Sequence, residues 1–169
     1  MNILVRNIQQ SDNPFLAKIV RDTLAEFGAN HPNTVYFDPR TDHLFETFET
    51  IRSTYFVIEQ NGVILGGAGI YPTEGLPSDI CELVKMYLLP TARGLGIGRM
   101  LIEKCIASAK ELKYNKIYLE TMPELKEALK MYAKFGFEYL NGAMGNSGHS
   151  GCSMWMIKNI GADSTTTLN

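Results

Sequence analysis

The feature that most constrains the fold is a glycine-rich turn between a buried strand and a helix. Residues 80–89 are mostly apolar and end at Pro90, which predicts a central β-strand. After Gly98, apolar residues recur at helical spacing for about four turns. A further strand is predicted at 116–120. Strand, helix and strand in this order predict a right-handed crossover unit.

The remaining periodicity predicts a mixed sheet around this unit. Before the turn we expect a strand at 3–8, a helix with its apolar face within 15–27 and a shorter helix with its apolar face within 44–51. Two hairpin strands are expected next, at 55–58 and 63–71, joined by a tight turn at Asn61-Gly62. After it we expect a helix entered at Pro123 and capped by Gly136, then an antiparallel pair at 137–140 and 152–158 around a glycine-rich loop. Helices on both faces of a mixed sheet predict a three-layer α/β fold.

Length and composition limit the classes of protein. A chain of 169 residues predicts a single domain at 1–160 followed by a polar tail at 161–169. Lys plus Arg (16) against Asp plus Glu (18) gives 16 − 18 = −2, so no positive field exists to gather nucleic acid. No apolar run approaches the ~18 residues of a membrane span, and the start is too short for a signal peptide.

The three cysteines, Cys81, Cys105 and Cys152, are widely spaced in apolar surroundings. This pattern favours buried reduced thiols over a disulfide framework, a metal site or a nucleophile. We therefore expect a cytoplasmic protein that has no metal and contacts neither a membrane nor nucleic acid.

The glycine-rich turn predicts an anion site. Backbone N–H groups from Gly94 to Gly98 and the helix N-terminus would converge on one place, most simply a pyrophosphate, with Arg93 and Arg99 on either side. A P-loop would need Lys-Ser/Thr after its last glycine, and Arg99-Met100 follows instead. A dinucleotide fingerprint starting at Gly94 would need glycine at 99, so that alternative is disfavoured.

The same residues resemble the GNAT family of N-acetyltransferases. Arg93-Gly94-Leu95-Gly96-Ile97-Gly98 fits its Arg/Gln-x-x-Gly-x-Gly/Ala pattern, and residues 128–137 fit its Ala-x-x-x-Tyr-x-x-x-Gly-Phe ending. The resemblance implies a GNAT-type α/β/α fold with a centrally splayed sheet and acetyl-CoA as cosubstrate. It implies transfer of the acetyl group to a primary amine of a small molecule or peptide by direct attack on the thioester. One departure is Leu125, where the family often has an asparagine that contacts the pantetheine arm.

The resemblance also assigns residues to acetyl-CoA and to the chemistry. The residues expected at the coenzyme are Met86, Tyr87, Leu88, Arg93, Gly94, Leu95, Gly96, Ile97, Gly98 and Arg99. Tyr132 matches the general acid, although its spacing also suits an apolar-face residue. Glu82 and Glu120 match glutamate bases of two branches of the family; each could instead be an ordinary strand residue, and water alone could accept the proton.

The acceptor side has candidates but no motif. His149 and Asn146 lie in the loop at 141–151 that often borders the acceptor amine, and a flexible solvated loop is the alternative interpretation. Asp38, Arg40, Asp42 and His43 cluster near the first two helices, in a turn that needs no functional explanation. The rival function is a catalytically silent acyl-CoA sensor. The sequence leaves the oligomeric state open, although the last strands could pair between subunits to form a homodimer.

Overall fold

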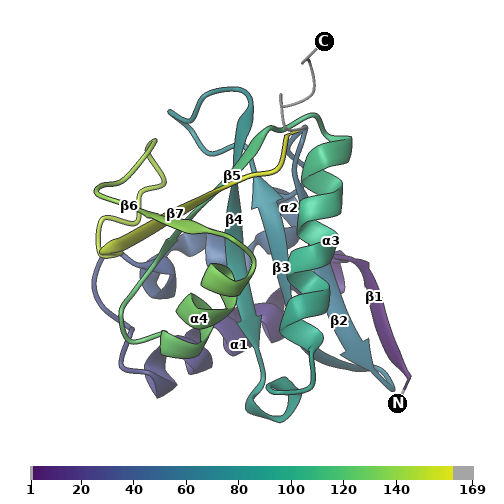
Figure 1. The fold of residues 1–169 in the computed structure, drawn as a ribbon. Helices are drawn as coiled ribbons and strands as arrows, with labels where there is room; N and C mark the ends of the chain where they lie inside the picture. Colours follow the sequence, from purple (N-terminus) through teal and green to yellow (C-terminus); the bar gives the residue numbers. More distant parts are fainter. Residues whose placement is uncertain (1, 162–169) are drawn as a thin grey trace.

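The computed structural model describes residues 2–161, so the expected tail lies outside the described residues except for Gly161. Within this part the chain forms a seven-stranded sheet of order β1-β2-β3-β4-β5-β7-β6 (Figure 1). The strands are β1 (Ile3–Asn7), β2 (Thr54–Gln60), β3 (Val63–Tyr71), β4 (Ile80–Leu88), β5 (Lys116–Thr121), β6 (Glu138–Leu140) and β7 (Met154–Asn159). The β4 and β5 strands are parallel and the other neighbours antiparallel, as expected of a mixed sheet.

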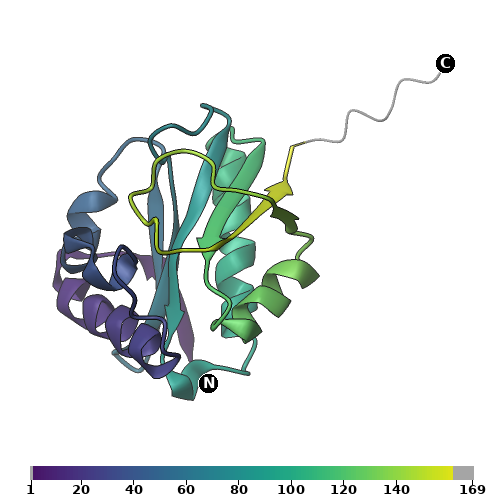
Figure 2. The ribbon, with the colours of Figure 1, turned by 90° about the vertical axis from the view of Figure 1, so that its left-hand side faces the viewer.

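The helices cover both faces of the sheet. They are α1 (Asn13–Glu26), α2 (Leu44–Thr47), α3 (Ile97–Glu111) and α4 (Lys126–Lys134), with short 3₁₀ turns at Gln10–Asp12, Val35–Phe37, Pro39–Asp42 and Pro90–Ala92. Figure 2 shows α1 and α2 on one face and α3 and α4 on the other. The expected three-layer α/β fold is therefore confirmed.

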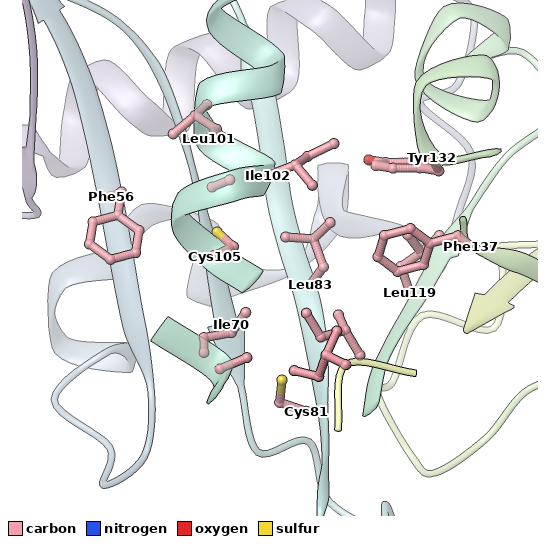
Figure 3. Packing of buried hydrophobic residues seen from close by; sticks show 14 of the residues in the cluster. Phe56, Ile70, Cys81, Leu83, Leu101, Ile102, Cys105, Leu119, Tyr132 and Phe137 are labelled. Atoms are coloured by element: carbon pink, nitrogen blue, oxygen red, sulfur yellow. The ribbon is translucent and has the colours of Figure 1, made fainter. Parts of the chain in front are cut away.

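Strand alternation divides the core between the two faces. On β2, Phe56 and Ile58 belong to the cluster under α3 and α4, part of which is drawn in Figure 3. Their neighbours Tyr55 and Val57 belong to the cluster under α1 and α2. Successive strand residues point to opposite faces, so a strand apolar at every position is buried on both sides.

The hairpin between β2 and β3 forms as predicted. Asn61 and Gly62 both have positive φ, 52° and 80°, the conformation that a two-residue hairpin turn of this twist requires. The turn joins Gln60 directly to its partner Val63.

Three details of the expected helices are wrong. The second helix, α2, ends at Thr47, and Ile51, assigned to its apolar face, is 85% exposed because a turn at 48–52 carries it away from the sheet. Phe15 on α1 and Phe27 just past its end are 60% and 38% exposed, since the buried apolar residues of that helix run from Leu16 to Leu24. The last helix begins at Lys126 rather than directly after Pro123.

Candidate active site

The site begins where β4 and β5 separate. The two strands pair only from Ile80 to Glu82, which lie opposite Lys116 to Tyr118. Beyond that point β4 stays paired with β3, and β5 with β7. The edge of β4 from Leu83 onward therefore has no strand partner on the β5 side in the described part of the chain. This confirms the expected splay in the sheet.

A β-bulge lies in the open part of β4. Lys85 and Met86 together oppose Ala68 of β3, and Lys85 has φ +50°. The extra residue breaks the alternation of side chains between the two faces of the sheet. Leu83 and Met86 pack toward α3, whereas the consecutive residues Val84 and Lys85 both line a small cavity on the α1 side.

The tyrosine hydroxyl of Tyr55 stabilises this bulge. It donates a 2.8 Å hydrogen bond to the carbonyl oxygen of Lys85. To reach it, the ring crosses β3 at glycines: a Cβ added at Gly67 would lie 2.5 Å from Tyr55 Cε1, and one at Gly69 would lie 2.7 Å from Cδ2. The small residues of β3 are therefore needed for this close approach.

A cleft with a volume of about 700 Å³ occupies the opening between β4 and β5. It is lined by β4, the glycine-rich turn, β5, the start of α4 and the loop before β7. The site residues predicted from the sequence that do line this cleft are Glu82, Met86, Tyr87, Leu88, Arg93, Gly94, Gly96, Gly98, Arg99, Glu120, Tyr132 and His149. This volume is within the range of small-molecule and cofactor sites.

The glycine-rich turn leads into the N-terminus of α3 as predicted. Gly94 and Gly96 have φ +73° and +77°, a conformation that other residues adopt only with strain, and Gly96 precedes the first residue of α3. The backbone N–H groups of the first turn of a helix have no partners within the helix. They and the helix dipole make this end of the cleft suited to an anion.

The two arginines at the turn differ in their contacts. Arg93 forms a two-pronged ion pair with Glu26 of α1 at 2.8 and 2.9 Å and donates to the carbonyl of Leu88. Arg99 is exposed and pairs with Glu103 one helical turn later. Leu95 and Ile97 are expected coenzyme residues that do not line the cleft; Leu95 is half exposed and Ile97 is buried.

Tyr132 of α4 lies on the wall of the cleft. Its ring packs edge-on against Phe137, with 5.8 Å between centroids, and its hydroxyl points away from α4 toward α3 (Figure 3). Within residues 2–161 this hydroxyl makes no hydrogen bond. Burial raises the pKa of Tyr132 well above its usual range, so the phenol is a proton donor rather than a phenolate.

Glu82 sits at the point where the strands part. It is 3% exposed, and one carboxyl oxygen accepts a 2.9 Å hydrogen bond from the hydroxyl of Thr73. Burial, reinforced by the negative charge of Glu120, raises the pKa of Glu82 to about 8. A carboxyl group with a pKa near the working pH can both accept and return a proton.

Glu120 faces the same cleft from β5, but its oxygens are engaged. One accepts a hydrogen bond from the Tyr118 hydroxyl at 2.9 Å, and the other accepts one from Ser147 of the loop before β7. The two glutamates that the sequence singled out are thus neighbours with different surroundings.

The loop at 141–151 brings His149 to the cleft. Its Nε2 lies 2.7 Å from Asp38, whose carboxylate also accepts from the Arg40 guanidinium at 2.9 Å. Burial alone would raise the pKa of Asp38, but the hydrogen bonds from His149 and Arg40 outweigh it and hold this pKa well below its usual range. Asn146 and His43 are exposed and line neither the cleft nor the small cavity beside it.

Sequence reasoning missed Lys85. Its side chain is 6% exposed and its Nζ lies 3.7 Å from Asp38. The signal was present, because Lys85 and Glu82 are the charged residues of a mostly apolar strand, but the bulge that turns Lys85 toward Asp38 leaves no mark in the periodicity. Sequence reasoning had grouped Asp38 and Arg40 only as members of a polar turn.

The cysteines are buried, as expected. Burial raises the pKa of both Cys81 and Cys152 to about 12, which disfavours the reactive thiolate. No group of three or more His, Cys, Asp or Glu side chains within residues 2–161 could hold a metal ion. No helix in the same range is long and apolar enough to span a membrane.

Comparisons with known proteins identify the family. The sequence model of the acetyltransferase (GNAT) family matches residues 16–137. The chain is 38% identical over 159 residues to an uncharacterised N-acetyltransferase of Escherichia coli (strain K12), YjgM, covering 93% of this chain and 95% of the relative. The chain therefore belongs to the GNAT acetyltransferase family, which confirms the expected family and enzyme class and sets aside the dinucleotide-binding alternative.

Solved structures agree on the fold. A GNAT-family acetyltransferase from Staphylococcus aureus Mu50 has a TM-score of 0.83 at 21% identity, covering 94% of this chain and 99% of that chain. The PaiA N-acetyltransferase of Thermoplasma acidophilum, solved in complex with coenzyme A, has a TM-score of 0.73 at 15% identity, covering 94% and 99%. The cytoplasmic location and the homodimer stay predictions.

Proposed function

We propose that this protein transfers the acetyl group of acetyl-CoA to a primary amine of a small molecule or peptide, by direct attack of the amine on the thioester. One observation carries the proposal. A single cleft joins the glycine-rich turn, the open edge of β4, the buried Glu82 and the Tyr132 phenol. These are the parts that amine acylation needs: a coenzyme site, a proton acceptor and a proton donor.

The residues of the cleft fit acetyl-CoA. Gly94 and Gly96 have no Cβ, and no protein atom beyond the adjacent residues lies within 4 Å of where one would be, so phosphate oxygens can approach the backbone of the turn. Arg93 and Arg99 line the same end of the cleft, where each also forms an ion pair with a glutamate. The edge of β4 at Met86, Tyr87 and Leu88 has no strand partner on the β5 side and would offer backbone groups to the amides of the pantetheine arm, although the Leu88 carbonyl already accepts from Arg93. When bound, acetyl-CoA supplies an activated acetyl thioester.

The chain's own residues would then move two protons. Glu82 would take a proton from the attacking amine, directly or through water, because its carboxyl group lies at the junction of the cleft and the acceptor side. Tyr132 would return a proton to the departing thiolate. Glu120 and His149 are second candidates for the base, and Leu125 offers an apolar contact where an asparagine is often found.

The test is release of free coenzyme A thiol from acetyl-CoA by the purified protein, with a panel of amines, amino acids and short peptides. Release that depends on the amine supports an acetyltransferase. If no amine causes release while acetyl-CoA still raises the Tm, the acyl-CoA sensor is the better function. If acetyl-CoA does not stabilise the fold either, the interpretation of the glycine-rich turn is wrong.

A further inference from the structure

A second, small cavity adjoins the cleft on the α1 side of the sheet. Its volume is about 30 Å³, and Glu82, Val84, Lys85 and His149 line both spaces. Arg40 forms part of its remaining wall. Since a cavity needs roughly 10–15 Å³ to hold one water, this one has room for a small polar group but not for a whole acceptor molecule.

Lys85 lines this region with a buried ammonium group that has one weak ion pair, to Asp38. The side chain is 6% exposed, yet the nearest charged partner of Nζ, Asp38, lies at 3.7 Å, beyond hydrogen-bond distance. Within residues 2–161, Nζ makes no hydrogen bond within normal distance, although an ammonium group has three protons to donate. A buried cation held only by one long ion pair is incompletely compensated, so a ligand that accepts hydrogen bonds from it would be favoured here.

Asp38 is already used by other donors. Its carboxylate accepts from the Arg40 side chain at 2.9 Å, from the Arg40 backbone at 2.9 Å and from His149 at 2.7 Å. These closer contacts to Arg40 and His149 leave Lys85 only the longer ion pair with Asp38, at 3.7 Å.

The small cavity has an excess of positive charge. Arg40 and Lys85 are cationic, and Asp38 is the carboxylate beside them. Glu82 lies on the same wall but is largely uncharged at neutral pH, because burial raises its pKa to about 8. Burial lowers the pKa of Lys85, Asp38 opposes this shift, and a ligand anion beside Lys85 would further favour its charged form. Glu120 lines the main cleft and not the small cavity.

We infer that the acceptor is a small zwitterionic amine, with its carboxylate in the small cavity against Lys85 and Arg40 and its amine at the junction beside Glu82. This inference rests on the proposed function and names the substrate class of the same site. Lys85 donates to the carboxylate, and Arg40 adds a second positive charge with spare N–H donors. A polyamine is disfavoured because its second ammonium would meet these two cations.

The experiment compares acceptors that differ only in the carboxylate. L-methionine, L-phenylalanine and L-glutamine are each paired with their carboxamides, and kcat/KM is measured by coenzyme A release at equal concentrations of the neutral amine. That correction is needed because the amide lowers the pKa of the neighbouring amine. Spermidine serves as the polyamine acceptor. Binding of each compound to the protein loaded with coenzyme A is measured in parallel by calorimetry.

The variants are chosen so that the effect of removing a positive charge can be distinguished from a failure to fold. Lys85→Met removes the charge and keeps an unbranched side chain of similar size, and Arg40→Gln removes the charge and shortens the side chain at a half-exposed site. Lys18→Met, on the exposed surface of α1, controls for the loss of one positive charge. Tm with acetyl-CoA reports whether each variant still folds and holds the coenzyme.

We expect at least one amino acid to be preferred over its amide by tenfold or more. Lys85→Met should bring that ratio close to one while leaving the stabilisation by acetyl-CoA unchanged, and Lys18→Met should keep it. Equal use of acid and amide, a preference that survives both charge removals, or a preference for spermidine would overturn the inference.

The binding measurement separates this inference from the proposed function. If no amine is acetylated but an amino acid binds beside coenzyme A and Lys85→Met abolishes that binding, the carboxylate subsite stands and the transferase does not. If no amino acid binds and none is acetylated, the subsite is refuted.

Discussion

The ionisation of Glu82 makes the stability of the folded protein fall as the pH rises, which is opposite to the usual effect of a carboxyl group. Its pKa is raised from 4.5 to about 8 in the folded protein, chiefly by burial. Between these values the unfolded chain has lost the proton and the folded chain keeps it, so the stabilisation present below pH 4.5 is lost as the pH rises to 8. Each pH unit in this window removes about 1.4 kcal/mol. The whole window therefore removes about 5 kcal/mol, a large share of the roughly 5–15 kcal/mol that stabilises a domain.

The variant Glu82→Gln keeps the shape of the side chain and cannot ionise. We expect the difference in unfolding free energy between variant and wild type to grow by about 4 kcal/mol from pH 5 to pH 8, in favour of the variant. Urea unfolding at a series of pH values measures it, and Glu111→Gln on the exposed end of α3 controls for the loss of one acidic group.

Further measurements test whether the raised pKa of Glu82 causes this pH dependence of stability. Thr73→Val removes the hydrogen bond that favours the ionised form, so it should extend the window to higher pH. A difference between Glu82→Gln and wild type that stays constant with pH would refute the reasoning. In the enzyme, coenzyme A release should rise as the pH approaches 8, and Glu82→Gln should lose this rise.

The other predictions concern the acid, the bulge and the glycine-rich turn. Tyr132→Phe should lower kcat by about 100-fold and change the Kd for acetyl-CoA little; equal loss of both would assign Tyr132 to packing or binding. Tyr55→Phe leaves the Lys85 carbonyl without its donor and should cost about 1–3 kcal/mol of stability; urea unfolding identical to wild type would show that the hydrogen bond contributes nothing. Gly96→Val places a β-branched residue at φ +77° and should cost about 1–3 kcal/mol and weaken acetyl-CoA binding in calorimetry, whereas Gly142→Val, at a site with open space, should do neither.

The sequence predicted the coenzyme side of the site well because that side depends on local backbone geometry. Glycines at 94, 96 and 98 between a strand and a helix define a turn without reference to distant residues. The Asn61-Gly62 hairpin was predictable for the same reason. Tyr132 and Glu82 came from the family resemblance, and periodicity alone would have assigned both to packing.

The acceptor side could not be predicted, because its residues meet only through tertiary contacts. Asp38 and His149 are 111 positions apart and come together through two irregular segments. Their neighbour Lys85 depends on the bulge. Exposure of Ile51 and Phe15 was missed for a related reason: spacing shows which residues can share a helix face, but not where a short helix ends or how far it sits from the sheet.

One irregularity of β4 links the coenzyme side to the acceptor side. Without the extra residue, strict alternation would place residue 85 on the same face as Cys81 and Leu83, in the apolar core under α3. With it, Lys85 turns to the other face, beside the edge of β4 that is free for the pantetheine arm. The bulge is supported by Tyr55, and Tyr55 reaches it only across Gly67 and Gly69. A side chain at either glycine, although neither residue lines the cleft or the small cavity, should therefore disturb coenzyme binding and acceptor selection together.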